Sequence, residues 1–345
     1  MGIKNFHSFM KKKAPNSYQS ISLQDLAGKK IAIDTSIFMC RYKSSLGSKW
    51  TSGFYTLVHT LVSHNIHFIF IFDGKAPPEK DKEREERMLS RTKVKNKISS
   101  LLEEWYQYSE DSNHHGQESL TIKDFENFPK LYEYTKKMKQ ENFTYNELSI
   151  KMMKMRKTLV PISKEDYTFL QEMLSILHVN YLVAIDNQEA ESLCVLLNKK
   201  NIVDAILTED TDAIAYGCSE MFFNLNLKEN KVHSLKLNSM LNELNFTYPQ
   251  LKDFCIMCGT DYNKNIKLVG PYKAYSLLVK HQNLEKITEI MNTKDLNFEK
   301  GRNLFDCEKF SEDLKIDSIE NSSEVILNTL DVKKYLFKNN IKLLF

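Results

Sequence analysis

Seven acidic residues occupy positions that could hold metal ions, because they follow short apolar runs or lie on a helical segment just beyond them. A lone acid in such a position is usually a solvent-exposed helix cap. A set of seven is different, since carboxylates a few ångströms apart cannot all ionise unless cations neutralise them. All-oxygen ligation suits a hard divalent ion, Mg²⁺ or Mn²⁺, better than zinc. The sequence therefore predicts a divalent metal site with these ligands: Asp34, Asp73, Glu189, Glu191, Asp210, Asp212 and Asp261.

Two pairs of these acids have a spacing of two residues, which constrains the backbone around them. Asp210 and Asp212 share a face if their segment is extended. Glu189 and Glu191 would diverge by roughly 200° on a regular helix, so we expect one of them to lie at an irregular helix start. Two metal ions ~3.5–4 Å apart can activate a water and stabilise the leaving oxygen of a phosphodiester.

Basic residues after the second acid could supply the fixed positive charge that a reacting phosphate needs. Lys80 and Arg87 are separated by two helical turns, so a helix would place them on one face. Arg84 and Arg91 form a second stripe with the same spacing. Each residue taken alone is equally well explained as surface charge on a helix.

Four short runs that are apolar on both faces are predicted to form buried parallel strands. They cover residues 31–33, 68–72, 182–184 and 206–207, and acids follow each of them. Helical patterns over 53–64, 164–178 and 190–200 lie between them. Alternating strands and helices predict an α/β fold, with a mostly parallel sheet flanked by helices. Ligands of such sheets bind beyond the carboxyl ends of the strands, where these acids fall.

The stretch from about residue 75 to 157 interrupts this alternation and is predicted to be a helical insertion. Residues 75–97 hold nine Lys or Arg against five acids, and residues 136–157 hold seven against two. The middle, residues 100–128, holds seven acids and one lysine. Charge runs are usually solvated helix faces, but loops at this place in the fold overhang the site. His114 and His115 at the tip are more simply explained as polar loop residues than as metal ligands.

The composition limits the class of protein. The 345 residues include only 10 Gly and 7 Pro, which argues against a many-stranded sandwich and favours long helices. The formal net charge is +3, so any attraction for nucleic acid must come from how charge is distributed. No secretory signal precedes the six cysteines, which predicts an intracellular, reduced protein. We expect the lone CxxC of Cys255 and Cys258 to be core rather than a zinc site. The apolar runs are too short to cross a bilayer, so no membrane contact is expected.

Residues 239–291 are predicted to form successive short helices, one of which begins at Gly270 and Pro271. Proline is tolerated in the first turn of a helix. The free backbone N–H groups and positive dipole end of a helix N-terminus suit a phosphate. This signal is weak alone, because many helices begin in this way.

Six segments in order resemble the flap endonuclease/XPG family of structure-specific 5′ nucleases. They are MGIKNF, IAIDTS, FDGKAPPEK followed by Arg87, NQEAESLC, LTEDTDAIAYG and CGTDYNKNIKLVGPYKA. The resemblance runs from residue 1 to about 281, with extra length concentrated in the charged insertion. It implies a PIN-like α/β domain, a helical arch above the active site and a helix–two-turn–helix that holds duplex DNA.

Carried over position by position, the resemblance implies a role for each matching residue. The seven acids match the ligands of two Mg²⁺ ions, for which Mn²⁺ can substitute. Lys80 and Arg87 match catalytic arch residues that engage the scissile phosphate, and Gly2 matches an N-terminal glycine near the DNA junction. The phosphate-gripping turn, which in relatives also holds K⁺ through backbone oxygens, is matched by Lys267, Gly270 and Lys273.

The sequence departs from the family pattern in several places. Cys40 stands where relatives often carry a base-stacking aromatic, and Tyr42 is the nearby aromatic expected to contact DNA. Leu268 replaces the first glycine of the phosphate-gripping turn, so a different backbone path is expected there, because leucine resists positive φ. The C-terminal region shows no glutamine-plus-paired-aromatic peptide for a sliding clamp. The insertion is longer than in cellular flap enzymes, and its acidic centre would repel DNA, which suits a gate or a partner surface.

We divide the chain into a nuclease region (1–100), a helical arch insertion (101–160), a second nuclease region (161–285) and a helical extension (286–345). The helix–two-turn–helix is expected at about 250–285. The predicted activity is Mg²⁺-dependent cleavage of flapped or branched DNA by a monomer, in DNA replication, repair or recombination. It would act at those sites in the nucleus, or in a cytoplasmic viral factory if the protein is viral.

Several other functions remain open at this stage. A 5′–3′ exonuclease or a four-way-junction resolvase would share the acids and differ in the arch and the C-terminal elements. A non-catalytic DNA-binding relative would have little reason to retain all of the acids. An unrelated Mg²⁺ phosphatase would leave the basic arch and the Gly-Pro turn without a purpose.

Overall fold

The computed structural model describes residues 2–3, 5–110, 119–263, 265–266, 268–291, 293, 296–314 and 325–344. It divides the chain into two compact units. The first consists of Met1–Phe38, Ser52–Glu83 and Lys164–Phe345, and the second of Met39–Thr51 and Arg84–Ser163. His114, His115 and Lys267, which the sequence analysis singled out, lie outside the described residues.

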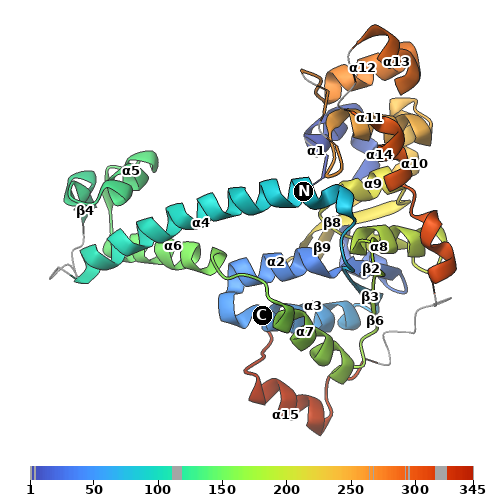
Figure 1. Ribbon diagram of the computed structural model, residues 1–345. Coiled ribbons are helices and arrows are strands. Elements are labelled where there is room, and N and C mark those ends of the chain that lie inside the picture. The colour runs from blue at the N-terminus through green and yellow to red at the C-terminus, as the bar shows by residue number, and fades with distance from the viewer. Residues whose placement is uncertain are drawn as a thin grey trace. The chain divides into compact units, whose positions relative to one another are not determined.

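The first unit is built on a sheet whose described strands have the order β1-β9-β8-β7-β2-β3-β6 (Figure 1). The strands from β8 to β6 in this order run parallel to their neighbours, whereas β9 pairs antiparallel with β8 and with β1. The prediction of a mostly parallel sheet is confirmed. The strand bounds are β1 (Tyr18–Ser22), β2 (Lys30–Asp34), β3 (His67–Phe72), β6 (Tyr181–Val183), β7 (Ala205–Leu207), β8 (Glu220–Asn226) and β9 (Lys231–Lys236).

The sequence analysis missed the antiparallel part of this sheet. Strand β8 exposes Asn224 and Asn226 on either side of the buried Leu225. A search for runs that are apolar on both faces passes over such an alternating strand, because one of its faces meets solvent.

Helices cover both faces of the sheet, as the continuously apolar strands predict. Side chains alternate along a strand, so Ile69 and Ile71 of β3 face the large core cluster that includes α8. Phe70 points to the opposite face, where its ring lies 5.9 Å from that of Phe54 in α3. The helices of this unit are α1 (Phe6–Lys13), α7 (Lys164–Ile176), α8 (Ala190–Lys199), α9 (Asp212–Tyr216), α10 (Leu237–Leu244), α11 (Tyr248–Cys258), α12 (Pro271–His281), α13 (Leu284–Ile290), α14 (Phe298–Leu304) and α15 (Leu330–Lys338).

The helices after β9 pack on one another, and Arg302 joins three of them through the buried Asp253 and the exposed Glu285. Arg302 of α14 donates hydrogen bonds to Asp253 of α11 at 2.7 and 2.6 Å, and to Glu285 of α13 at 2.6 Å. Cys255 and Cys258 are buried in α11, which confirms that the CxxC is core. Helices α11 and α12, joined by a loop, occupy the region predicted to be the helix–two-turn–helix.

Three helices begin in one unit and end in the other: α2 (Thr35–Leu46), α3 (Trp50–Ser63) and α4 (Asp81–Glu110). Short 3-10 turns lie between the longer elements. They are η1 (Pro15–Ser17), η2 (Leu23–Leu26), η3 (Gly47–Lys49), η4 (Pro78–Lys80), η5 (Ile122–Phe125) and η6 (Glu308–Asp313).

The second unit contains most of the stretch predicted to be a helical insertion, together with Met39–Thr51, and it has a core of its own. Helix α4 is long because residues 81–110 contain neither Gly nor Pro, and it continues through residue 100, where a region boundary was placed from sequence. It is followed by β4 (Leu120–Thr121), α5 (Pro129–Lys137), β5 (Asn142–Phe143) and α6 (Tyr145–Thr158), and β4 pairs antiparallel with β5. Trp105, Tyr108 and Phe125 lie in its buried core. Among the described residues, no helix has the length and apolar character needed to cross a bilayer.

Candidate metal centre

The carboxyl ends of the central parallel strands bring three of the predicted acids to one edge of the sheet. Asp34 is the last residue of β2 and pairs in register with Ile71 of β3. Asp73 follows β3 directly, and Asp210 comes three residues after the end of β7. Because the strands are parallel, all three ends lie at the same edge.

Hydrogen bonds fix the two acids that end β2 and β3. The hydroxyl of Thr208 donates to Asp34 Oδ2 at 3.0 Å. Asp73 accepts from the backbone N–H of Ala190 at 2.9 Å and from the hydroxyl of Ser36. Ala190 is the first residue of α8, so Asp73 also neutralises the positive end of that helix.

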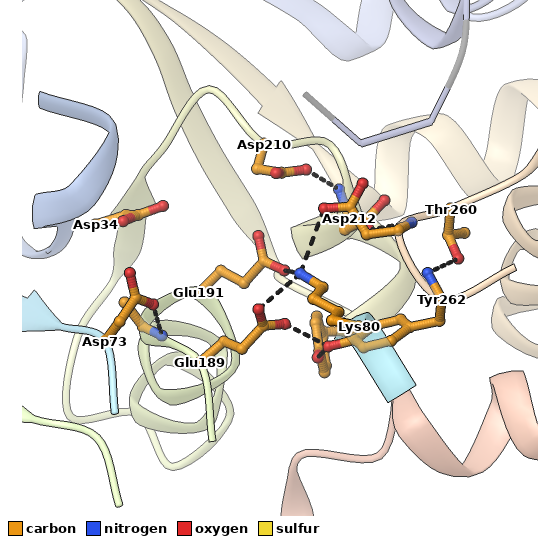
Figure 2. Close-up of polar contacts among 12 residues, drawn as sticks. Asp34, Asp73, Lys80, Glu189, Glu191, Asp210, Asp212, Thr260 and Tyr262 are labelled. Atoms are coloured by element: carbon orange, nitrogen blue, oxygen red, sulfur yellow. Dashed lines mark hydrogen bonds and ion pairs between the residues drawn. The ribbon is translucent and has the colours of Figure 1, made fainter. Parts of the chain in front are cut away.

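Glu189 and Glu191 take the arrangement that their spacing required. Glu189 is the N-cap of α8, with extended backbone angles (φ −95°, ψ 155°), and Glu191 lies in the first turn. The irregular backbone at Glu189 lets both side chains point toward Lys80 (Figure 2). The expectation that one of the two lies at an irregular helix start is confirmed.

Asp210 and Asp212 are brought together by a turn, so the extended backbone on which their shared face was conditional is not the one found. Thr211 between them is helical (φ −73°, ψ −8°), and the N–H of Asp212 donates to Asp210 Oδ1 at 3.1 Å. Asp212 is fully buried, and its Oδ2 accepts from the N–H of Asp261 at 3.4 Å. Its Oδ1 has no hydrogen-bond partner among the described residues.

Lys80 lies among the acids rather than on the helix that follows it. Its Nζ is 2.7 Å from Glu189 Oε1, 3.3 Å from Asp261 Oδ2 and 3.9 Å from Glu191 Oε1. The residue is only 6% exposed and belongs to η4, one residue before α4 begins. The spacing argument, which placed Lys80 and Arg87 on one helix face, therefore does not describe Lys80. Arg87 lies on α4 within the second unit.

Burial, followed by the charge of neighbouring acids, raises the pKa of Asp34, Glu191, Asp210 and Asp212. Burial, followed by the charge of Asp73, raises the pKa of Asp34 to about 8. Burial and then Asp210 raise the pKa of Glu191 and of Asp212 well above the usual range. Burial disfavours the charge on Lys80, but Glu191, Glu189 and Asp261 outweigh it, so the pKa of Lys80 lies above its ordinary value. Such a cluster ionises fully only when additional cations enter it.

The donor set fits a hard divalent cation, although its present spacing does not form a ligand cage. Within the described ranges, no three acidic, histidine or cysteine side chains stand close enough together to hold one ion. The ammonium of Lys80 supplies the positive charge among them instead. The all-oxygen donors, the unpartnered buried oxygen of Asp212 and the raised pKa values all fit Mg²⁺ or Mn²⁺.

Gly2 lies directly against the Asp210–Asp212 turn. Its φ of +78° is in the left-handed region, and a Cβ there would collide with Asp210 Oδ1 and lie 2.6 Å from Thr211 Oγ1. The N–H of Ile3 donates to the same Thr211 hydroxyl at 2.8 Å. Only glycine fits this position, so the N-terminal segment is part of the site's wall.

The remaining predicted residues lie on other elements. Gly270 is the N-cap of α12 and Lys273 is exposed in its first turn. Leu268 has φ +62° and is 84% exposed, so the expectation that leucine would avoid a left-handed backbone is wrong. Tyr42 lies on the part of α2 that belongs to the second unit, as does the exposed Cys40.

Sequence reasoning missed three polar residues that contact the acids. Ser36 and Thr208 donate to Asp73 and Asp34, and the Tyr262 hydroxyl donates to Glu189. Each lies within two residues of a strand end or of a predicted ligand in the chain. That adjacency was the available signal.

Comparison with known proteins identifies the family. Residues 1–94 match the XPG N-terminal domain and residues 178–261 match the XPG I-region. A probable RAD2-like endonuclease, 369L of Invertebrate iridescent virus 6, is 32% identical over 87% of this chain and 76% of its own length. Flap endonuclease 1 of Theileria parva is 28% identical over 90% of this chain and 58% of its own.

A solved structure shares the fold. The catalytic core of Rad2 in complex with DNA substrate aligns with a TM-score of 0.57 and 19% identity, covering 99% of this chain and 81% of that one. The predicted PIN-like α/β architecture is thereby confirmed. Together with the two matched regions and the viral relative, the sheet that gathers these acids shows that the chain belongs to the flap endonuclease/XPG family of nucleases.

Proposed function

We propose that this protein is a Mg²⁺-dependent, structure-specific 5′ nuclease that cuts DNA at 5′ flaps, leaving 5′-phosphate and 3′-hydroxyl ends. The observation that carries this proposal is that the seven acids, from five separate stretches of chain, lie near enough to influence one another electrostatically, with Lys80 paired to three of them. Membership of a nuclease family and the similarity to flap endonuclease 1 of Theileria parva support it.

The acids would hold two divalent ions, and Mn²⁺ would serve in place of Mg²⁺. When bound, such a pair activates water for attack on phosphorus and stabilises the leaving oxygen. The protein's own part is to hold the ligands: Thr208 and Ser36 orient Asp34 and Asp73 through hydrogen bonds. Oriented ligands keep their geometry during the reaction and so lower its barrier.

Lys80 would stabilise the charge that builds up on the scissile phosphate. Its ammonium is already desolvated and held within ion-pair distance of three of the acids. When ions take the place of the ammonium among the acids, Lys80 would still lie in this low-dielectric site, where a cation stabilises developing negative charge better than one in water. We assign Arg87 a second phosphate contact, on the strength of the family resemblance.

The helices after the sheet would hold the duplex next to the flap. The N-terminus of α12, with Gly270 as its N-cap, offers backbone N–H groups to a phosphate, and the exposed Lys273 adds positive charge.

The remaining assignments come from the family resemblance. Gly2 would face the DNA junction, and Tyr42 would contact a base. We place potassium, Lys267 and Gly270 at the turn before α12 from the resemblance alone. We further propose a monomer that acts in DNA replication, repair or recombination.

One panel of substrates tests this function. A 5′-flap duplex, a four-way junction, a linear duplex and a chromogenic phosphoester are incubated with the full chain, with Mg²⁺ or with chelator. The proposal expects Mg²⁺-dependent cleavage that is fastest on the flap. Faster cutting of the junction or of a linear end would assign the resolvase or exonuclease activity, and no DNA cleavage by folded protein would reject a nuclease.

Two variants that carry the same Asp→Asn change at different positions test the metal assignment. Asp212→Asn removes the charge of a fully buried ligand and should abolish cleavage while leaving the fold intact by circular dichroism. Asp331→Asn makes the same change at an exposed residue of α15 and should cut like the native protein. Equal activity of the two variants would show that the metal assignment is misplaced.

A further inference from the structure

Tyr262 joins two groups of the site and has no role in the proposed function so far. Its ring centroid lies 4.9 Å from Lys80 Nζ, and its hydroxyl donates a hydrogen bond to Glu189 Oε2 (Figure 2). Glu189 in turn contacts Lys80 through its other carboxylate oxygen at 2.7 Å. Each of Tyr262, Glu189 and Lys80 therefore contacts the other two.

The backbone of Tyr262 is held in a tight turn after α11. Its N–H donates to the hydroxyl of Thr260 at 3.2 Å, and that hydroxyl donates to Asn263 Oδ1 at 2.6 Å. Its ring meets the ring of Phe305 edge-on, with centroids 5.3 Å apart. The Tyr216 hydroxyl is 2.7 Å from the Tyr262 hydroxyl and fixes its direction. Tyr262 is thus rigid on both its backbone and its side-chain ends.

Lys80 needs such a support because its side chain is flexible. A lysine has a four-carbon stem, and ordering it costs rotamer entropy. Its own element, η4, is a short turn that begins at Pro78, so the neighbours of Lys80 must fix the side chain. A cation over the face of a tyrosine is attracted by the ring, and the attraction is stronger where water is excluded, as it is for this buried ammonium.

We propose that Tyr262 is a positioning residue of the nuclease site, whose ring holds the Lys80 ammonium and whose hydroxyl orients Glu189. The proposal rests on the proposed function for the roles of Lys80 and Glu189. Because Tyr262 lies in the loop between α11 and α12, it also connects the proposed duplex-holding helices to the residue that meets the phosphate.

Two substitutions separate the two contacts. Tyr262→Phe keeps the ring and loses the hydroxyl, so it should retain most of the support for Lys80 but raise the Mg²⁺ concentration needed for half-maximal cleavage. Tyr262→Leu loses both, and kcat should fall roughly tenfold below that of Tyr262→Phe, with the KM for flap DNA little changed. Equal kcat for the two variants would overturn the role of the ring. An unchanged Mg²⁺ requirement in Tyr262→Phe would overturn the role of the hydroxyl.

A double-mutant cycle with Lys80→Ala tests whether the ring acts through the lysine. In the Lys80→Ala background, Tyr262→Leu and Tyr262→Phe should have the same kcat, because no ammonium is left to position. A persistent tenfold difference between them would show that the ring acts in another way. Tyr18→Leu is the matched control, since that ring, on β1, lies 5.9 Å from Lys11 Nζ and its hydroxyl is hydrogen-bonded to His7 at 2.8 Å. It should leave the kcat unchanged.

A second readout needs no catalysis. In chelator, the losses of melting temperature caused by Lys80→Ala and Tyr262→Leu should be less than additive in the double variant, because both remove the same contact. Additive losses would contradict the inference. If the native protein cut no DNA, the proposed function would fail, and this melting cycle alone would still decide whether Tyr262 holds Lys80.

Discussion

Replacing Lys80 by alanine should make the stability of the protein depend on metal much more than it does in the native chain. The ammonium lies among Glu189, Glu191 and Asp261 and is within ion-pair distance of all three. Without it, buried carboxylates face one another uncompensated unless a divalent ion enters or protons remain bound.

The size of the effect follows from the burial of the group. Removing one partner of a buried ion pair typically costs about 3–5 kcal/mol, because the other partner stays buried and unpaired. Unfolding entropies near 2 cal/mol/K per residue give roughly 0.7 kcal/mol/K for a chain of this length. The melting temperature of Lys80→Ala in chelator should therefore fall by about 4–7 °C.

The assay is thermal unfolding followed by circular dichroism, in chelator and in saturating Mg²⁺. Mg²⁺ should raise the melting temperature of Lys80→Ala more than that of the native chain, because the ion binds without displacing an ammonium. Lys300→Ala is the control: this lysine is half exposed, lies 3.5 Å from Glu79 and should change stability by under about 1 kcal/mol. The reasoning is refuted if Lys80→Ala melts with the native chain in chelator, or if Mg²⁺ stabilises both equally.

Three further substitutions have outcomes that the structure fixes. Gly2→Ala forces a Cβ into the Asp210–Asp212 turn at a positive φ; flap cleavage should fall at least about tenfold in a folded protein, and native activity would refute the close approach. Leu268→Gly relieves a left-handed leucine with φ +62° and should stabilise the chain by about 0.5–1 kcal/mol in urea unfolding; a loss of stability would contradict this. Arg302→Met leaves the buried Asp253 without its guanidinium and should cost about 2–3 kcal/mol in the same assay, whereas an unchanged urea midpoint would count against that ion pair.

The sequence predicted the sheet and the gathering of acids because both follow from local pattern. Strands β2, β3 and β7 are buried on both faces, so their residues are apolar without alternation, and parallel strands place their following acids at one edge. The hairpin of β8 and β9 was not predicted, because one face of β8 meets solvent and its residues therefore alternate between buried and exposed. The sequence pattern alone could not distinguish this hairpin from a loop.

The contacts within the site depended on backbone details that spacing does not determine. A spacing of two placed Asp210 and Asp212 together, but a helical Thr211 achieved this rather than an extended segment. Lys80 lies in η4 ahead of α4, so helical spacing did not apply to it. Tyr262, which contacts Lys80, lies in a loop 182 residues after it in the chain. No local sequence pattern relates positions so far apart.

The central claim is that acids from distant stretches of chain converge to hold two divalent ions. Anomalous diffraction from crystals of the protein grown with Mn²⁺ tests it most directly. We expect two manganese peaks about 4 Å apart, with the Lys80 ammonium displaced from between the acids. The peaks should lie within ligand distance of carboxylates from this set: Asp34, Asp73, Glu189, Glu191, Asp210, Asp212 and Asp261. Peaks at other residues, or well-ordered acids around Lys80 with no manganese bound, would contradict it.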